Sequence, residues 1–178
     1  MRTYAFIDAS NIIYGAKAEG WFIDHEKLFN YLRKRFRASK VYFYFGTDDK
    51  NAKQVRFLQK LKSFGYVLRV KQIKWYGARI KANCDVDLTL DMILLKDKYH
   101  GAVVLTGDGD FLPLFEHLRT IGKKITVMAF TQRTSQDLRR FAGGDFIGLS
   151  NERYLLERKS HKNGEDPKLG SFPSFIER

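Results

Sequence analysis

The chain has 178 residues, which is the length of one ordinary globular domain. Hydrophobic residues make up 44% of it, too many for a generally disordered chain, and no run of about 18 apolar residues is present that would span a membrane. The 32 Lys and Arg against 20 Asp and Glu give a net charge of +12, which favours polyanionic partners, although a chain can also simply be basic.

Strand-like and helix-like segments alternate along the chain. In chain order, we predict a strand at 4–8, a helix at 28–36, a strand at 41–45, a helix at 52–64, a strand at 66–70, a helix at 85–96, a strand at 102–106, a helix at 110–121, a strand at 125–130, a helix at 135–141 and a strand at 146–149. Gly65 stands where the C-cap glycine of its helix belongs. This alternation predicts an α/β fold with a parallel sheet and helices on both faces.

The pattern covers residues 1–159, which we predict to form one domain. From Ser160 onward the composition turns to Lys, Asn, Gly, Glu, Asp, Pro and Ser, which is typical of a flexible tail over 160–178.

The N-terminus leads directly into the first predicted strand, without the pattern of a secretory signal. The one cysteine, Cys84, cannot form an intramolecular disulfide, and the four histidines do not have the spacing of zinc ligands. We therefore expect a cytoplasmic protein.

Carboxylates follow two of the predicted strands at the point where each strand ends. Asp8 ends the first strand, and Asp108 and Asp110 follow the strand at 102–106. In open α/β sheets, ligands bind beyond the carboxyl ends of the strands, where the strand order reverses. We therefore expect these side chains to lie at the functional site.

A third acidic group opens the helix at 85–96 and contains Asp85, Asp87 and Asp91. Asp87 and Asp91 are four residues apart and share a helix face, whereas Asp85 and Asp91 do not. Asp85, in the first turn or at the N-cap, is therefore the favoured site residue. Asp87 or Asp91 is either a second contributor to the site or only a solvated residue on the helix surface.

Clustered carboxylates repel one another, and folded proteins tolerate them mainly when a cation or shared protons neutralise them. Hard oxygen ligands suit Mg²⁺ or Mn²⁺, which can activate water for attack on a phosphodiester. Taken singly, each aspartate is better explained as a turn or cap residue, and Asp110 can be the N-cap of its helix. The combination favours a metal site.

A long acid-free basic stretch lies between residues 50 and 83. It contains ten cationic side chains: Lys50, Lys53, Arg56, Lys60, Lys62, Arg69, Lys71, Lys74, Arg79 and Lys81. Trp75 and Tyr76 lie within it, and aromatic rings among cations suit unpaired, stacked RNA bases. Packing into the core explains these two rings equally well.

The predicted RNA-binding residues are Lys74, Trp75, Tyr76, Arg79, Lys81 and, after the strand at 125–130, Arg133. Ser135 also follows that strand, and we interpret it as the N-cap of the next helix.

Three motifs occur in an order that resembles a known family. They are Phe6-Ile7-Asp8-Ala9-Ser10-Asn11, Lys81-Ala82-Asn83-Cys84-Asp85-Val86-Asp87-Leu88 with Asp91, and Thr106-Gly107-Asp108-Gly109-Asp110-Phe111. Over about residues 4–149 the sequence resembles the NYN domain family of PIN-like nucleases, and within it the bacterial LabA-like branch. The resemblance implies a PIN-like (Rossmann-like) three-layer α/β/α sandwich with a mainly parallel sheet, a Mg²⁺ or Mn²⁺ site and ribonuclease activity. It is also compatible with a homodimer.

The resemblance assigns roles to individual residues. It implies that Asp8, Asp85, Asp108 and Asp110 are the catalytic acids and that Asn11 assists Asp8. Three positions depart from the family pattern without removing an acid. Ala9 and Ala82 stand where glycine is frequent, and Thr106 stands where serine is common, which keeps the hydroxyl.

The leading hypothesis is a metal-dependent ribonuclease that hydrolyses single-stranded RNA, with Asp8, Asp85 and Asp108 as metal ligands. Whether it cuts internally or from an end is left open. The alternative is a non-catalytic RNA-binding or regulatory module with a vestigial metal site. A small-molecule phosphotransfer enzyme is disfavoured, because the Gly107–Asp110 turn is too acidic to cradle phosphate without a metal.

Overall fold

A computed structural model describes residues 1–47, 51–72, 74–76, 79–81 and 84–159, with the backbone alone for 74–76 and 79–81. The strands are β1 (Thr3–Asp8), β2 (Ala38–Thr47), β3 (Val67–Gln72), β4 (Lys74–Tyr76), β5 (Arg79–Lys81), β6 (Gly101–Leu105), β7 (Lys124–Ala129) and β8 (Phe146–Gly148). The helices are α1 (Ala9–Ala18), α2 (His25–Arg35), α3 (Ala52–Phe64), α4 (Asp85–Leu94), α5 (Leu112–Thr120), α6 (Gln136–Ala142) and α7 (Arg153–Leu156), joined in places by short 3-10 turns.

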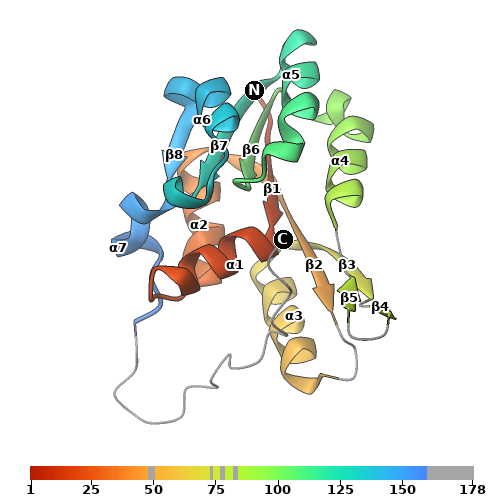
Figure 1. The fold of residues 1–178 in the computed structure, drawn as a ribbon, viewed down its shortest axis with the longest axis vertical. Coiled ribbons are helices and arrows are strands. Elements are labelled where there is room, and N and C mark those ends of the chain that lie inside the picture. Colours follow the sequence, from red (N-terminus) through yellow and green to blue (C-terminus); the bar gives the residue numbers. More distant parts are fainter. Residues whose placement is uncertain (48–50, 73, 77–78, 82–83, 160–178) are drawn as a thin grey trace.

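The main sheet has six strands in the order β3-β2-β1-β6-β7-β8, and every neighbouring pair is parallel. The chain builds outward from β1 to β2 and β3, and then continues with β6 on the other side of β1 (Figure 1). The strand order therefore reverses between β1 and β6, where Ile7 lies opposite Leu105. This confirms the predicted fold class and puts the ends of these two strands at the switch point.

The side chains of β1 alternate between two hydrophobic clusters, one on each face of the sheet. Ala5 and Ile7 pack in a cluster with residues of α1, α2 and α3. Tyr4 and Phe6 pack in a second cluster with residues of α4, α5 and α6. Two helical layers around one parallel sheet make the predicted three-layer sandwich. Within the part of the chain that is described, no helix is long and apolar enough to cross a membrane.

Helix α1 was not predicted from the sequence. It begins directly after Asp8, whose side chain accepts a hydrogen bond from the backbone N–H of Asn11, and it buries Ile12 and Ala16. Gly15, a poor helix former, lies in its interior and obscures the pattern. Phe130 explains why glycine stands at position 15, because a Cβ there would lie 2.1 Å from a ring carbon of this buried side chain.

We predict that Gly15→Ala destabilises the protein, although alanine is the better helix former. Phe130 is 1% exposed, so its ring cannot move away from the added methyl group without disturbing the core. The expected loss in the free energy of unfolding is about 1–3 kcal/mol, measured by chemical denaturation.

The matched control is Gly144→Ala, since a Cβ at Gly144 meets nothing within 4 Å. We expect this variant to stay within about 0.5 kcal/mol of the parent. A stabilised Gly15→Ala variant would show that Phe130 does not constrain α1.

Candidate functional site

Asp8 and Asp108 follow adjacent strands, and the side chain of Thr106 links them. The hydroxyl of Thr106, which is fully buried, donates to Oδ2 of Asp8 at 3.1 Å. Oγ1 of Thr106 in turn accepts a hydrogen bond from the backbone N–H of Asp108 at 3.2 Å. Thr106 therefore orients the Asp8 carboxylate and also fixes the backbone at Asp108.

Asn11 ties the first turn of α1 to the loop after β6. Its backbone N–H donates to Oδ1 of Asp8 at 3.2 Å, and its side-chain oxygen accepts from the backbone N–H of Gly107 at 3.0 Å. Both carboxylate oxygens of Asp8 are thus hydrogen-bonded, one to Asn11 and the other to Thr106. The structure places Asn11 where it can support Asp8.

The glycines of the loop after β6 permit close contact with the segment after β7. A Cβ at Gly107 would lie 2.7 Å from the carbonyl oxygen of Arg133, and one at Gly109 would lie 2.7 Å from Oγ of Ser135. The backbone N–H of Ser135 donates to the carbonyl of Gly107 at 3.0 Å. Residue Arg133, whose side chain is exposed, therefore lies beside the acidic loop.

Asp108, rather than Asp110, is the capping residue of this loop. Its Oδ1 accepts from the backbone N–H of Asp110 at 3.0 Å and caps the 3-10 turn Gly109–Phe111 that leads into α5. The interpretation of Asp110 as the N-cap of its helix is therefore wrong. Asp110 is exposed on the turn that Asp108 caps.

Asp85 is the first residue of α4, and Cys84 occupies the N-cap position without a side-chain cap bond. Leu88 and Met92 follow Asp85 at offsets of three and seven, so the three share one helix face. Leu88 and Met92 are buried against the sheet, at 1% and 0% exposure. The same face therefore carries the partly buried Asp85 toward the sheet.

Desolvation raises the pKa of the Asp8 carboxyl to about 6. The negative charges of Asp85 and Asp108 raise this pKa further, and hydrogen bonds from Asn11 and Thr106 lower it. Repulsion from these two acids shows that the three predicted metal ligands share one electrostatic environment. An ionised Asp8 at neutral pH is an unfavourable charge that a cation would stabilise.

Asp87 and Asp91 turn away from this cluster toward β3. Asp87 pairs with Lys71 at 2.9 Å, and Asp91 pairs with Nε of Arg69 at 2.6 Å. The hydroxyl of Tyr44 also donates to Asp91 at 2.8 Å, and burial, together with this bond, raises the pKa of Tyr44 well above its usual range. In the described structure Asp91 is an ion-pair partner on a helix face different from that of Asp85.

The cluster fits a divalent cation in charge and donor type, since carboxylates are the ligands that Mg²⁺ and Mn²⁺ prefer. It is not a formed coordination shell, because among the described residues no three His, Cys, Asp or Glu side chains are grouped closely enough to hold an ion. Asp8 and Asp108 instead direct oxygens to hydrogen bonds within the protein. Cation binding would have to compete with these bonds.

Cys84, next to Asp85, is an unsuitable nucleophile. Burial raises the pKa of its thiol to about 12, with a further contribution from the charge of Asp87. A neutral thiol is neither a good nucleophile nor a ligand for a hard cation.

Part of the predicted RNA-binding surface lies outside the described residues. This holds for the side chains of Lys74, Trp75, Tyr76, Arg79 and Lys81, whose backbone forms the antiparallel β4–β5 pair beside the lower end of α4 (Figure 1). Within the described part, α3 exposes Lys53, Arg56, Lys60 and Lys62.

Arg69 and Lys71, which the sequence grouped with this basic stretch, form ion pairs with acids of α4. Strand alternation, which puts Val67, Arg69 and Lys71 on one face of β3, is the signal that could have separated them.

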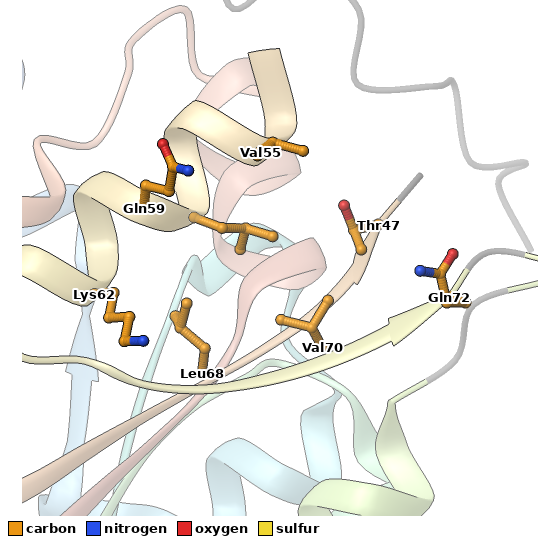
Figure 2. A pocket seen from close by; sticks show the side chains of 8 residues that line it. Thr47, Val55, Gln59, Lys62, Leu68, Val70 and Gln72 are labelled. Atoms are coloured by element: carbon orange, nitrogen blue, oxygen red, sulfur yellow. The ribbon is translucent and has the colours of Figure 1, made fainter. Parts of the chain in front are cut away.

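A shallow hollow of about 320 Å³ lies between α3 and β3, and no carboxylate lines it (Figure 2). Its lining is largely apolar and includes Val55, Leu58, Leu68 and Val70. None of the predicted site residues lines it. An apolar lining suits neither a phosphate nor a divalent cation, so the acidic edge stays the candidate site.

The fold and the acidic edge define an α/β protein of PIN-like architecture. Residues 2–150 match the NYN domain, so the chain belongs to the NYN domain family, a PIN-like family associated with nuclease activity. It is 32% identical over 165 residues to the low amplitude and bright protein LabA of Synechococcus elongatus, with 88% of each chain covered.

A solved structure of a Vibrio parahaemolyticus protein of unknown function has a similar fold. The TM-score is 0.77 at 22% identity, and the match covers 88% of this chain and 96% of that one. At that identity the likeness shows the fold alone. The match of residues 2–150 to the NYN domain and the 32% identity to LabA confirm the family resemblance inferred from the three motifs.

We predict that Asp8→Asn stabilises the protein at pH 7.5 in the absence of metal. Asparagine can keep the cap on α1, while it removes a carboxylate whose folded pKa of about 6 exceeds the unfolded value of 3.8. Ionised Asp8 therefore costs stability in full above about pH 6, and the cost disappears as the pH falls toward 4. We expect a gain of about 1–3 kcal/mol at pH 7.5 that shrinks with falling pH, measured by denaturant titrations.

The matched control is Asp97→Asn, because the side chain of Asp97 is 80% exposed. It should change the free energy of unfolding by less than about 0.5 kcal/mol throughout this pH range. An Asp8→Asn variant that is less stable than the parent at every pH would contradict the proposed strain on Asp8.

Proposed function

We propose that this NYN protein is a metal-dependent ribonuclease that hydrolyses phosphodiester bonds of single-stranded RNA. The observation that carries the proposal is the Asp8 carboxylate at the switch point, which Thr106 ties to the backbone of Asp108 and whose pKa the charge of Asp85 raises. Membership of the NYN family supports the nuclease class. The metal, the substrate and the residue roles are our inference.

In this proposal Asp8, Asp85 and Asp108 hold a Mg²⁺ or Mn²⁺ ion. When bound, such an ion supplies Lewis acidity toward water and toward the phosphodiester. Thr106 and Asn11 orient Asp8 through the hydrogen bonds described above, so this ligand is preorganised. Asp110, exposed at the next turn, assists at the open side of the cluster.

The choice of RNA rests on charge. The net charge of +12 and the absence of acids between residues 50 and 83 favour a phosphate backbone as ligand. We propose that three groups contact the RNA: the cations of α3, Arg133, and the β4–β5 segment with Lys74, Trp75, Tyr76, Arg79 and Lys81. Arg133 is supported by position, since its backbone packs against Gly107 in the acidic loop.

The second candidate is an RNA-binding module without catalysis. One observation favours it: in the described part of the chain, the carboxylates do not form a ready coordination shell. The two functions make opposite predictions for cleavage and the same prediction for RNA binding.

We predict that the protein cleaves a 5′-labelled, unstructured RNA in Mn²⁺ or Mg²⁺ and that excess chelator stops the reaction. Asp8→Asn and Asp108→Asn should each lower kcat by at least about 100-fold, because each removes a proposed ligand. Gel-based cleavage assays measure this, and RNA affinity in calcium or without metal should change little.

Asp97→Asn is again the control, because it removes an exposed acid remote from the cluster and should leave cleavage unchanged. Full activity in Asp8→Asn, Asp108→Asn or excess chelator would rule out the proposed mechanism. Tight RNA binding by the parent with no cleavage in either metal would establish the non-catalytic alternative.

A further inference from the structure

Helix α4 carries two chemically different faces that pack against the rest of the fold. Asp85, Leu88 and Met92 form the face toward the sheet, and Leu88 and Met92 are buried there. Asp87 and Asp91 form a second face that pairs with β3. Asp85 and Asp91 are six residues apart, which at 3.6 residues per turn separates them by about 120° around the axis. A contact that holds Asp91 therefore also sets the direction of Asp85.

The contact at Asp91 joins three elements of the fold. Oδ2 of Asp91 accepts from Tyr44 of β2 at 2.8 Å and from Nε of Arg69 of β3 at 2.6 Å. Tyr44 is 1% exposed and the Asp91 side chain 19%, so the Tyr44–Asp91 end of this network is shielded from water, whereas the Arg69 side chain is 44% exposed. The Arg69 guanidinium also lies over the ring of Tyr42, 5.5 Å from its centre.

Residues 73–84 separate the end of β3 from Asp85, and after α4 the hydroxyl of Tyr99 donates to the carbonyl oxygen of Met92 at 2.8 Å. Apolar packing of Leu88 and Met92 keeps the helix on the sheet, but it is non-directional. Charge-assisted hydrogen bonds have defined geometry and can fix the rotation of a helix about its axis.

We propose that Asp91 is a positioning residue. Its hydrogen bonds with Arg69 and Tyr44, here called the Asp91 lock, fix the rotation of α4 and thereby hold Asp85 beside Asp8. The inference rests on the proposed metal-dependent function. It gives Arg69 the role of holding α4 rather than of contacting RNA. It also means that Asp91 is not a metal ligand.

A second ion pair on the same two elements provides a matched control. Lys71 and Asp87 lie 2.9 Å apart, and their side chains are 48% and 46% exposed. Exposed pairs contribute little to stability, and this one lacks a buried third partner like Tyr44. Asp87→Asn should therefore have little effect on the site.

The experiment compares Asp91→Asn, Arg69→Met and the double variant with the parent. Mn²⁺ affinity is measured by calorimetry without RNA, and kcat and KM are measured on the labelled RNA. We expect each single variant to weaken Mn²⁺ binding about 10- to 100-fold and to lower kcat, with KM within about twofold. The double variant should be no worse than the worse single one, because both substitutions break the same lock.

Tyr44→Phe keeps the ring in the core and removes only the hydroxyl, so it tests the lock even if an Asp91 variant folds poorly. It should weaken Mn²⁺ binding by about threefold or more, while Asp87→Asn stays within about twofold of the parent.

The remaining outcomes each overturn the proposal. Loss of Mn²⁺ binding in Asp91→Asn with normal binding in Arg69→Met would make Asp91 a metal ligand. A higher KM in Arg69→Met with unchanged Mn²⁺ affinity would make Arg69 an RNA contact. If the parent binds Mn²⁺ and cleaves RNA while all lock variants match it, the lock alone is wrong. If the parent neither binds Mn²⁺ nor cleaves RNA, the proposed function itself fails and the lock loses its purpose.

Discussion

The two oxygens of the Asp8 carboxylate are held in different directions at the point where β1 passes into α1. One accepts from the backbone of Asn11 and the other from the hydroxyl of Thr106. Through these bonds one side chain connects the central strand, the first helix and the loop after β6. The bonds only partly offset the desolvation of the charge and the repulsion from Asp85 and Asp108. A site that is strained without a ligand is typical of functional positions, where stability is given up for binding or catalysis.

The acids of α4 divide between two tasks. Asp87 and Asp91 are neutralised by cations of β3, whereas Asp85 lies on the face that carries it toward Asp8. Asp87 and Asp91 thus have cationic partners on β3, and the repulsion at the site involves fewer charges than the sequence suggests. The basic stretch is divided in the same way: Arg69 and Lys71 serve the fold, and the exposed cations of α3 stay available to an external polyanion.

Sequence periodicity was sufficient for much of this fold. The helix Ala52–Phe64 and its C-cap Gly65 were predicted as they occur, and the ends of β1 and β6 were placed at the switch point that the topology confirms. Periodicity failed at α1, because Gly15 interrupts the helical pattern for a reason that lies at Phe130, more than a hundred residues away.

Pairings across the fold also lay beyond the sequence. The pairing of Asp91 with Arg69 depends on how β3 packs against α4, and the residues next to Asp91 in the sequence do not predict it. The same limit applied to the acidic loop, where Asp110 was the cap candidate from the sequence and the backbone geometry selects Asp108. Residue types and strand ends indicated a candidate site, while the directions of its side chains required coordinates.

In the proposed function, Asp8, Asp85 and Asp108 together hold a divalent cation. The most direct measurement is a crystal structure of the protein with Mn²⁺, with the ion located by its anomalous scattering. The account predicts one strong peak about 2.0–2.3 Å from oxygens of all three carboxylates, with Asp91 still bound to Arg69. A saturated crystal with no peak at this edge, or with the ion bound at Asp87 and Asp91, would contradict it.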